Sequence, residues 1–211
     1  MNILQRPFKY TYHSSVFVLI GINILVFILQ KTFPVITAYA SMVPALVISQ
    51  HWLWQFVTYM FAHDPSNISH LLFNMLALFV FGMQVERQMG TKEFLLYYFV
   101  TGILAGVFSF AVFCATGSYG VFLLGASGAV FAVQLAYATF FPNAVLLLWG
   151  IIPLRAPVLV LGFTALEIVF VLTGRQSNVA HLTHLAGFAF GWLYFLIRFR
   201  INPWKHLIRR R

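Results

Sequence analysis

The chain has 211 residues, of which 61% are hydrophobic and only 8% are charged. Soluble globular domains carry about 25% charged residues, so the charged side chains here are too few to cover a water-facing surface. The composition also fits neither a disordered chain nor, with Cys114 as the single cysteine, a disulfide scaffold. We therefore predict an all-α polytopic membrane protein with one domain over residues 1–211.

Six apolar runs, separated by polar or turn residues, predict six membrane-spanning helices. In chain order they lie near residues 14–30, 70–85, 94–114, 127–141, 156–172 and 181–197. The predicted core is therefore about 14–198, with short cytoplasmic tails at 1–13 and 199–211. The alternative of a signal peptide, suggested by Ala38-Tyr39-Ala40 after the first run, would leave five spans and separate the basic tails.

The net charge of +9 is concentrated on one side of these spans. With both termini inside, only Lys31 and Arg175 lie outside, as expected when basic residues stay on the cytoplasmic side. Basic flanks of this kind interact with membrane lipids, so we expect no nucleic acid as a partner. The minimal six-span form suits a bacterial inner membrane. The inner basic residues are Arg6, Lys9, Arg87, Lys92, Arg155, Arg198, Arg200, Lys205, Arg209, Arg210 and Arg211.

The outer segment 31–69, between the first two spans, is too apolar for a plain linker. Aromatic rings are favoured at the membrane–water interface, so we expect this segment to lie there. Its aromatic residues are Trp52, Trp54, Phe56, Tyr59 and Phe61.

The fourth predicted span is too short to cross the bilayer. Residues 127–141 form a helix of roughly 22 Å, against a hydrocarbon thickness of roughly 30 Å. Because Pro142-Asn143 ends it on the inner side, its outer end begins inside the membrane. This submerged N-terminus carries Ser127.

Four polar side chains from three spans are predicted to lie at one depth. Counted from the inner ends of their spans, Ser127 and His184 each lie roughly 21 Å up, and His70 and Asn74 bracket that level. Intramembrane polar residues are costly and mark functional sites. We therefore predict a site in the outer third of the bilayer, open to the outer side.

Small residues indicate that the fourth and sixth spans pack closely. Gly128, Ala132 and Ala136 form a stripe on the fourth span, and Gly187 and Gly191 form a GxxxG pattern with His184 on the sixth. Such faces let membrane helices approach at short distance. If they meet, Ser127 comes within hydrogen-bond reach of His184.

A serine beside a histidine indicates acyl transfer, with Ser127 as the nucleophile and His184 as the general base. The N–H groups of a helix N-terminus and the side chains of His70 and Asn74 can stabilise an oxyanion. Three alternatives stay open. Asp64 or Glu167 could orient the histidine, although Glu167 is more readily an interior acid that is neutral or hydrogen-bonded. His181 could replace His184 as the base. The polar residues could also serve only helix packing or helix capping.

Three motifs, in this order, resemble the rhomboid family of intramembrane serine proteases. The stretches 70–74, 125–128 and 184–191 look like HxxxN, GxSG and HxxGxxxG on the second, fourth and sixth helices, and 86–90 resembles ExxxG. The resemblance covers about residues 52–197. It implies a six-transmembrane-helix bundle with a short, submerged fourth helix.

The resemblance also implies an activity, the cleavage of transmembrane segments of other membrane proteins that enter laterally near the fifth helix. It implies a Ser127–His184 catalytic dyad and an oxyanion hole of His70, Asn74 and the Ser127 backbone N–H. No metal or cofactor is expected. The supporting residues are Gly125, Gly128, Phe131, Gly187 and Gly191.

Two positions depart from the family pattern. Gln55 follows Trp54 where the family often has arginine, which is expected to alter the outer segment or its lipid contacts. Phe131 stands where the family often has a tyrosine that stacks on the catalytic histidine, so orientation of His184 is expected to depend more on packing.

Two other functions compete with proteolysis. A rhomboid-like membrane-client binding protein without activity would typically lack the serine or the histidine, and both are present. A metal or haem centre on His63, His70, His181 and His184 has no HExxH motif and no nearby acidic ligand to support it.

Overall fold

The fold is known from a computed structural model that describes residues 5–6, 8–148, 150–173 and 178–207, without the side chains of Asn178 and Val179. Arg175, which we expected on the outer side, and Arg209, Arg210 and Arg211, which we expected on the inner side, lie outside the described residues.

The described part of the chain contains five helical stretches that are long and apolar enough to cross a membrane. A shorter apolar helix, α8 (Ser127–Phe140), is the predicted fourth span. The prediction of a polytopic, mostly helical membrane protein is thereby confirmed. The five stretches are α1 (Ser15–Thr32); α5 (Ile68–Ala77), the π-helical turn η2 (Leu78–Gly82) and α6 (Met83–Met89); α7 (Thr91–Ala115); α9 (Ala156–Thr173); and α10 (Asn178–Tyr194) with the π-helical turn η3 (Phe195–Phe199).

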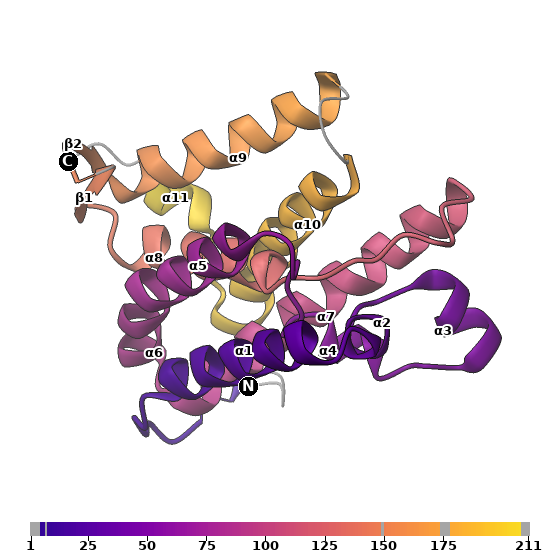
Figure 1. The fold of residues 1–211 in the computed structure, drawn as a ribbon. Coiled ribbons are helices and arrows are strands. Elements are labelled where there is room, and N and C mark those ends of the chain that lie inside the picture. Colours follow the sequence, from indigo (N-terminus) through magenta and orange to yellow (C-terminus); the bar gives the residue numbers. More distant parts are fainter. Residues whose placement is uncertain (1–4, 7, 149, 174–177, 208–211) are drawn as a thin grey trace.

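Shorter elements connect the spans. The outer segment contains α2 (Val35–Ala40), α3 (Pro44–Gln50) and α4 (Gln55–Thr58), and α11 (Pro203–Leu207) follows the last span. The sequence did not predict the antiparallel hairpin of β1 (Val145–Leu148) and β2 (Ile152–Arg155), in which Val145 pairs with Arg155. Figure 1 shows this hairpin at the end of the bundle opposite α2 and α3.

The helix α8 lies in the middle of the bundle, and α9 lies along its edge (Figure 1). Residues from Gly128 to Thr139 are buried except for the half-buried Phe131, and α8 contacts α5, α6, α7, α9 and α10. A helix that is apolar on all sides fits such a central position. The surrounding helices therefore fix the position of α8 and of its first residue, Ser127.

Glycines bring α8 and α10 into direct contact. A Cβ atom on Gly187 would lie only 1.9 Å from the carbonyl oxygen of Gly128. A Cβ atom on Gly191 would lie 2.6 Å from the Tyr97 hydroxyl and 3.0 Å from the Cβ atom of Ala132. The two small-residue faces therefore meet, with no room for a larger side chain.

Two buried acids, Glu86 and Glu93, join helices near the predicted inner end of the bundle. The Glu86 carboxylate accepts hydrogen bonds from the backbone N–H groups of Ser15 and Val16, at the N-terminus of α1, where a negative charge is favourable. The Glu93 carboxylate accepts two hydrogen bonds of 2.7 Å from the Arg198 guanidinium, which joins α7 to η3.

Gln55 has a defined structural role in the outer segment. Its buried amide accepts a hydrogen bond from the backbone N–H of Val43 and donates one to the backbone oxygen of Ala38. This departure from the family pattern therefore joins α4 to the chain around α2 and α3.

Tyr59 corrects the expectation that every aromatic residue of this segment is interfacial. It is only 1% exposed, and its hydroxyl donates to the backbone oxygen of Gly102 inside the bundle. Trp52 and Trp54 instead form a ring stack with the exposed Tyr39.

Candidate active site

Ser127 and His184 lie in hydrogen-bond contact, although 57 residues separate them in sequence. The Oγ atom of Ser127, at the first position of α8, is 2.7 Å from Nε2 of His184 on α10. Both residues are partly exposed. The close approach of Gly187, one turn after His184 on α10, to Gly128, the residue that follows Ser127 on α8, produces this contact.

The loop before Ser127 is fixed by the outer segment. Met42 and Leu123 exchange two backbone hydrogen bonds of 2.9 Å, and the N–H of Gly125 donates to the backbone oxygen of Tyr59. Gly125 has φ +124°, a conformation that side-chain-bearing residues rarely adopt. The backbone thus enters α8 through a defined turn.

His70 lies beside that turn. A Cβ atom on Gly125 would be 3.0 Å from Nε2 of His70 and 3.6 Å from Oγ of Ser127. The absent side chain of Gly125 therefore leaves space for the His70 ring next to the serine.

Asn74 lies one turn further along α5 and is buried. Its Nδ2 atom donates to the backbone oxygen of His70, 2.8 Å away. One Nδ2 hydrogen is thus used within the helix, and the second remains for another acceptor.

Phe131 stacks on the ring of His184. Their centroids are 4.6 Å apart and the planes differ by 7°. Phe131 lies one turn after Ser127 on α8, so one helix supplies both the hydroxyl and the surface that orients the imidazole.

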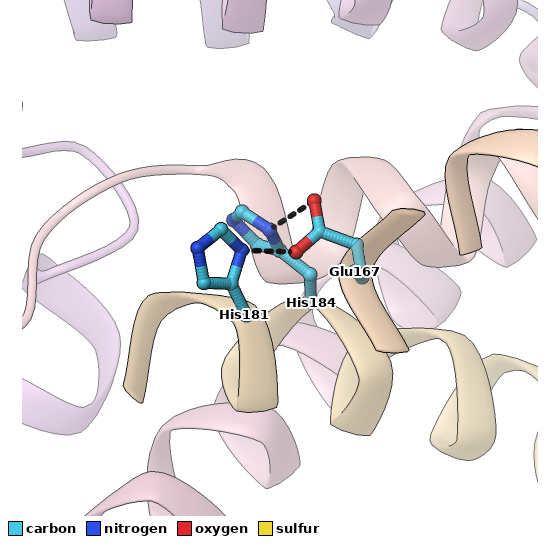
Figure 2. Close-up of side chains that lie close together, drawn as sticks. All are labelled: Glu167, His181 and His184. Atoms are coloured by element: carbon cyan, nitrogen blue, oxygen red, sulfur yellow. Dashed lines mark hydrogen bonds and ion pairs between the residues drawn. The ribbon is translucent and has the colours of Figure 1, made fainter. Parts of the chain in front are cut away.

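Glu167 and His181 lie next to His184, and the Glu167 carboxylate contacts both histidine rings (Figure 2). Glu167, on α9, places Oε1 3.1 Å from Nδ1 of His184 and Oε2 2.5 Å from Nδ1 of His181. The depth of Glu167 in its span did not reveal that it faces the histidines, because depth carries no information on rotation about the helix axis. His181 contacts the carboxylate rather than Ser127.

The same group is the one set of potential metal ligands within the described residues, with ligand atoms within 4.8 Å of one another. Two ligands of one zinc ion lie about 3.3 Å apart when each is about 2.0–2.1 Å from the metal. The 2.5 Å contact between Glu167 and His181 is shorter and has the length of a strong hydrogen bond. The geometry therefore fits a carboxylate shared by two imidazoles better than a metal centre.

His63 lies behind His70 and belongs to neither group. It is fully buried, packs edge-to-face on His70 with ring centroids 5.1 Å apart, and has no hydrogen-bond partner on either ring nitrogen. Burial, followed by the nearby charge of His70, lowers the pKa of His63 to about 4. His63 is therefore uncharged at neutral pH.

Comparison with known proteins identifies the family to which this chain belongs. The rhomboid domain matches residues 50–201, which include every residue of the Ser127 and Glu167 contacts described above. The chain belongs to the rhomboid family.

Relatives of the chain come from distant organisms. It is 32% identical over 174 residues to "Rhomboid-like protease 2" of Toxoplasma gondii, covering 79% of the chain and 56% of that protein. It is 29% identical over 161 residues to "Rhomboid protease AarA" of Providencia stuartii, covering 70% and 56%. It is 33% identical over 147 residues to "RHOMBOID-like protein 12, mitochondrial" of Arabidopsis thaliana, covering 63% and 43%. The chain therefore spans about half the length of these relatives.

Proposed function

We propose that this rhomboid protein is an intramembrane serine endopeptidase, with Ser127 as the nucleophile and His184 as the general base. The observation that carries the proposal is the 2.7 Å contact between Ser127 Oγ and His184 Nε2 at the N-terminus of a short, central helix. A serine hydroxyl is a poor nucleophile until a hydrogen-bonded base removes its proton.

The reaction follows from these two side chains. Ser127 Oγ attacks the carbonyl carbon of the peptide bond, while Nε2 of His184 takes the hydroxyl proton. When the C–N bond breaks, the imidazolium returns that proton to the leaving amine. Water, deprotonated by His184 in the same way, then hydrolyses the acyl-enzyme and regenerates the Ser127 hydroxyl.

The oxyanion of the tetrahedral intermediate would be stabilised by the backbone N–H of Ser127 and by the side chains of His70 and Asn74. The N–H groups of the first turn of a helix have no intrahelical partner, and the helix dipole favours negative charge there. Loss of one such donor lowers kcat by about 10²–10³-fold in other serine proteases. The Gly125 turn places the His70 ring beside Ser127, which supports this assignment.

The substrates proposed are transmembrane segments of other membrane proteins, cleaved at the outer side of the membrane. Arg87 and Arg155, next to the inner ends of α6 and α9, support cytoplasmic termini.

A bacterial inner membrane stays a prediction, since the relatives include a mitochondrial protein of Arabidopsis thaliana as well as a protein of Providencia stuartii.

Labelling with a fluorophosphonate probe tests the nucleophile. Purified protein in detergent should be labelled at Ser127, as mapped by mass spectrometry, and labelling should be lost in Ser127→Ala and His184→Ala. Ser109→Ala is the matched control, because Ser109 is a buried serine that hydrogen-bonds to Thr183 and lies outside the proposed site. Labelling of properly folded Ser127→Ala at the wild-type rate would contradict the assignment.

The same assay separates the rival functions. Labelling and cleavage should persist in a metal chelator, because no step uses a metal ion. Activity that is lost in the chelator and restored by zinc would favour a metal enzyme. A folded wild-type protein that is neither labelled nor able to cleave any transmembrane segment would favour a client-binding protein.

A further inference from the structure

Each of the four acids of the chain has a distinct set of partners. Asp64 accepts hydrogen bonds from Ser66 in an exposed turn. Glu86 accepts hydrogen bonds from the first backbone N–H groups of α1, and Glu93 forms an ion pair with Arg198. Glu167 is the acid that contacts histidines, and one of these is the proposed general base.

Glu167 lies on the far side of the imidazole from Ser127. One ring nitrogen of His184, Nε2, contacts Ser127 Oγ, and the other, Nδ1, is 3.1 Å from Glu167 Oε1 (Figure 2). This Nδ1 atom is buried and makes no well-aligned hydrogen bond in the structure. A buried polar nitrogen without a partner is costly, and the carboxylate is the charged group next to it.

We propose that Glu167 is a positioning residue for His184, and that His181 holds the Glu167 carboxylate in place. The proposal rests on the proposed function, because it gives the serine and its base a third member. A small rotation of the carboxylate would align Oε1 with the Nδ1–H group. That bond keeps the proton on Nδ1, so that Nε2 is free to accept the Ser127 proton, and the negative charge stabilises the imidazolium that forms.

His181 supplies the second arm of this group. It lies one turn before His184 on α10, is buried, and packs against Phe170 on α9 with ring centroids 5.0 Å apart. Its 2.5 Å contact fixes one carboxylate oxygen, which leaves the other oxygen at His184. A carboxylate fixed at two points loses less conformational entropy when the transition state forms.

The dependence on pH comes from all groups that face His184. These are Glu167 on α9, His181 on α10, Ser127 and the uncharged Phe131 on α8, and His70, which lies close enough on α5 for a charge interaction. Among them Glu167 is the negative group, and a nearby negative charge favours a protonated imidazole. Removing it should therefore move the acid limb of the rate profile to lower pH.

The test compares Glu167→Gln with wild type in cleavage of a transmembrane substrate. We expect kcat to fall about 10–100-fold with KM changed less than about twofold, since the group acts on the base rather than on substrate binding. The acid limb should move to lower pH, because the variant lacks the negative charge beside the imidazole. Thr164→Val, which removes a polar group one turn away on α9, is the control and should match wild type.

Two further variants separate positioning from a merely structural role. Glu167→Asp keeps the charge and should retain the wild-type acid limb while kcat falls only partly. His181→Gln should lower kcat, and the double variant Glu167→Gln/His181→Gln should be no slower than Glu167→Gln, because the two side chains act as one unit. Equal kcat and equal acid limb in wild type and Glu167→Gln would overturn the proposal.

A measurement without catalysis keeps this inference separate from the proposed function. In ¹⁵N-histidine NMR spectra, assigned with a His184→Gln variant, neutral His184 should carry its proton on Nδ1, and this population should fall in Glu167→Gln. A proton on Nε2 in wild type, or unchanged populations in the variant, would contradict the role of Glu167. Failure of Ser127 labelling in wild type would instead contradict the proposed function.

Discussion

At the scale of single residues, the candidate site depends both on a glycine, which leaves space for a neighbouring ring, and on an aromatic ring that fills space. Gly125 leaves the space that the His70 ring occupies, and Phe131 supplies a flat surface parallel to the His184 ring. The geometry around Ser127 is therefore sensitive to small changes in volume.

The change Gly125→Ala should inactivate the protein without unfolding it. The new Cβ atom would lie 3.0 Å from His70 Nε2, at a residue with φ +124°, which costs about 1–3 kcal/mol of strain. We expect cleavage and fluorophosphonate labelling to fall at least tenfold. Gly120→Ala, in the same loop with nothing within 4 Å of its Cβ position, should behave as wild type. Wild-type rates in Gly125→Ala would show that the turn does not shape the site.

The change Phe131→Leu should lower kcat while KM and the expressed amount stay near wild type. Leucine keeps the apolar character of the position but lacks the plane that stacks on His184 at 4.6 Å. The loss corresponds to about 0.5–1.5 kcal/mol of aromatic contact, or roughly 2–10-fold in rate. Phe131→Tyr keeps a stacking ring and should retain the rate. A larger loss in Phe131→Tyr than in Phe131→Leu would exclude stacking as the reason.

At the scale of elements, the contact between α8 and α10 positions Ser127 and His184, the proposed nucleophile and base. The two helices approach so closely that the backbone of Gly128 fills the space of a side chain at Gly187. Ser127 directly precedes Gly128, and His184 lies one turn before Gly187, so this contact brings the serine and the histidine together.

The change Gly187→Ala should therefore affect stability and activity together. Its Cβ atom would lie 1.9 Å from the Gly128 carbonyl oxygen, so the helices must move apart, at a cost of about 1–3 kcal/mol or more. We expect a lower unfolding midpoint in denaturant and loss of Ser127 labelling. Gly162→Ala on α9, where the new Cβ atom meets nothing within 4 Å, is the matched control. Equal midpoints in both variants would contradict the close-packing account.

From the sequence, the depth of a residue in the membrane could be predicted better than the direction in which its helix face points. Counting residues along a helix gives height in the membrane, because the rise per residue is constant, and this placed Ser127 and His184 at one level. The side of α9 that carries Glu167 depends on how α9 packs against α10, which no local pattern records. The buried amide of Gln55 and the hairpin after α8 were missed for the same reason, since both depend on contacts between distant segments.

At the scale of the whole molecule, the short central helix and the distribution of charge together predict an orientation in the membrane. The loop before Ser127 pairs with the outer segment, while the hairpin β1–β2 lies at the opposite end of the bundle (Figure 1). The positive residues next to the hairpin predict that this end is cytoplasmic.

Labelling of single cysteines tests that orientation. In a Cys114→Ser background, Tyr119→Cys in the outer loop and Ile151→Cys in the hairpin are both exposed positions, at 45% and 79%. A membrane-impermeant maleimide should label Tyr119→Cys on intact spheroplasts and Ile151→Cys only after permeabilisation. The reverse pattern would mean that the site opens to the cytoplasm.

The central claim is that Ser127 and His184 cut peptide bonds within membrane proteins. The most direct measurement reconstitutes the purified protein in liposomes with a test protein that has a single transmembrane helix, and maps the products by mass spectrometry. We predict one cut within or at the outer edge of that helix for wild type, and none for Ser127→Ala or His184→Ala of equal stability. Cleavage that continues unchanged in either variant would contradict the account.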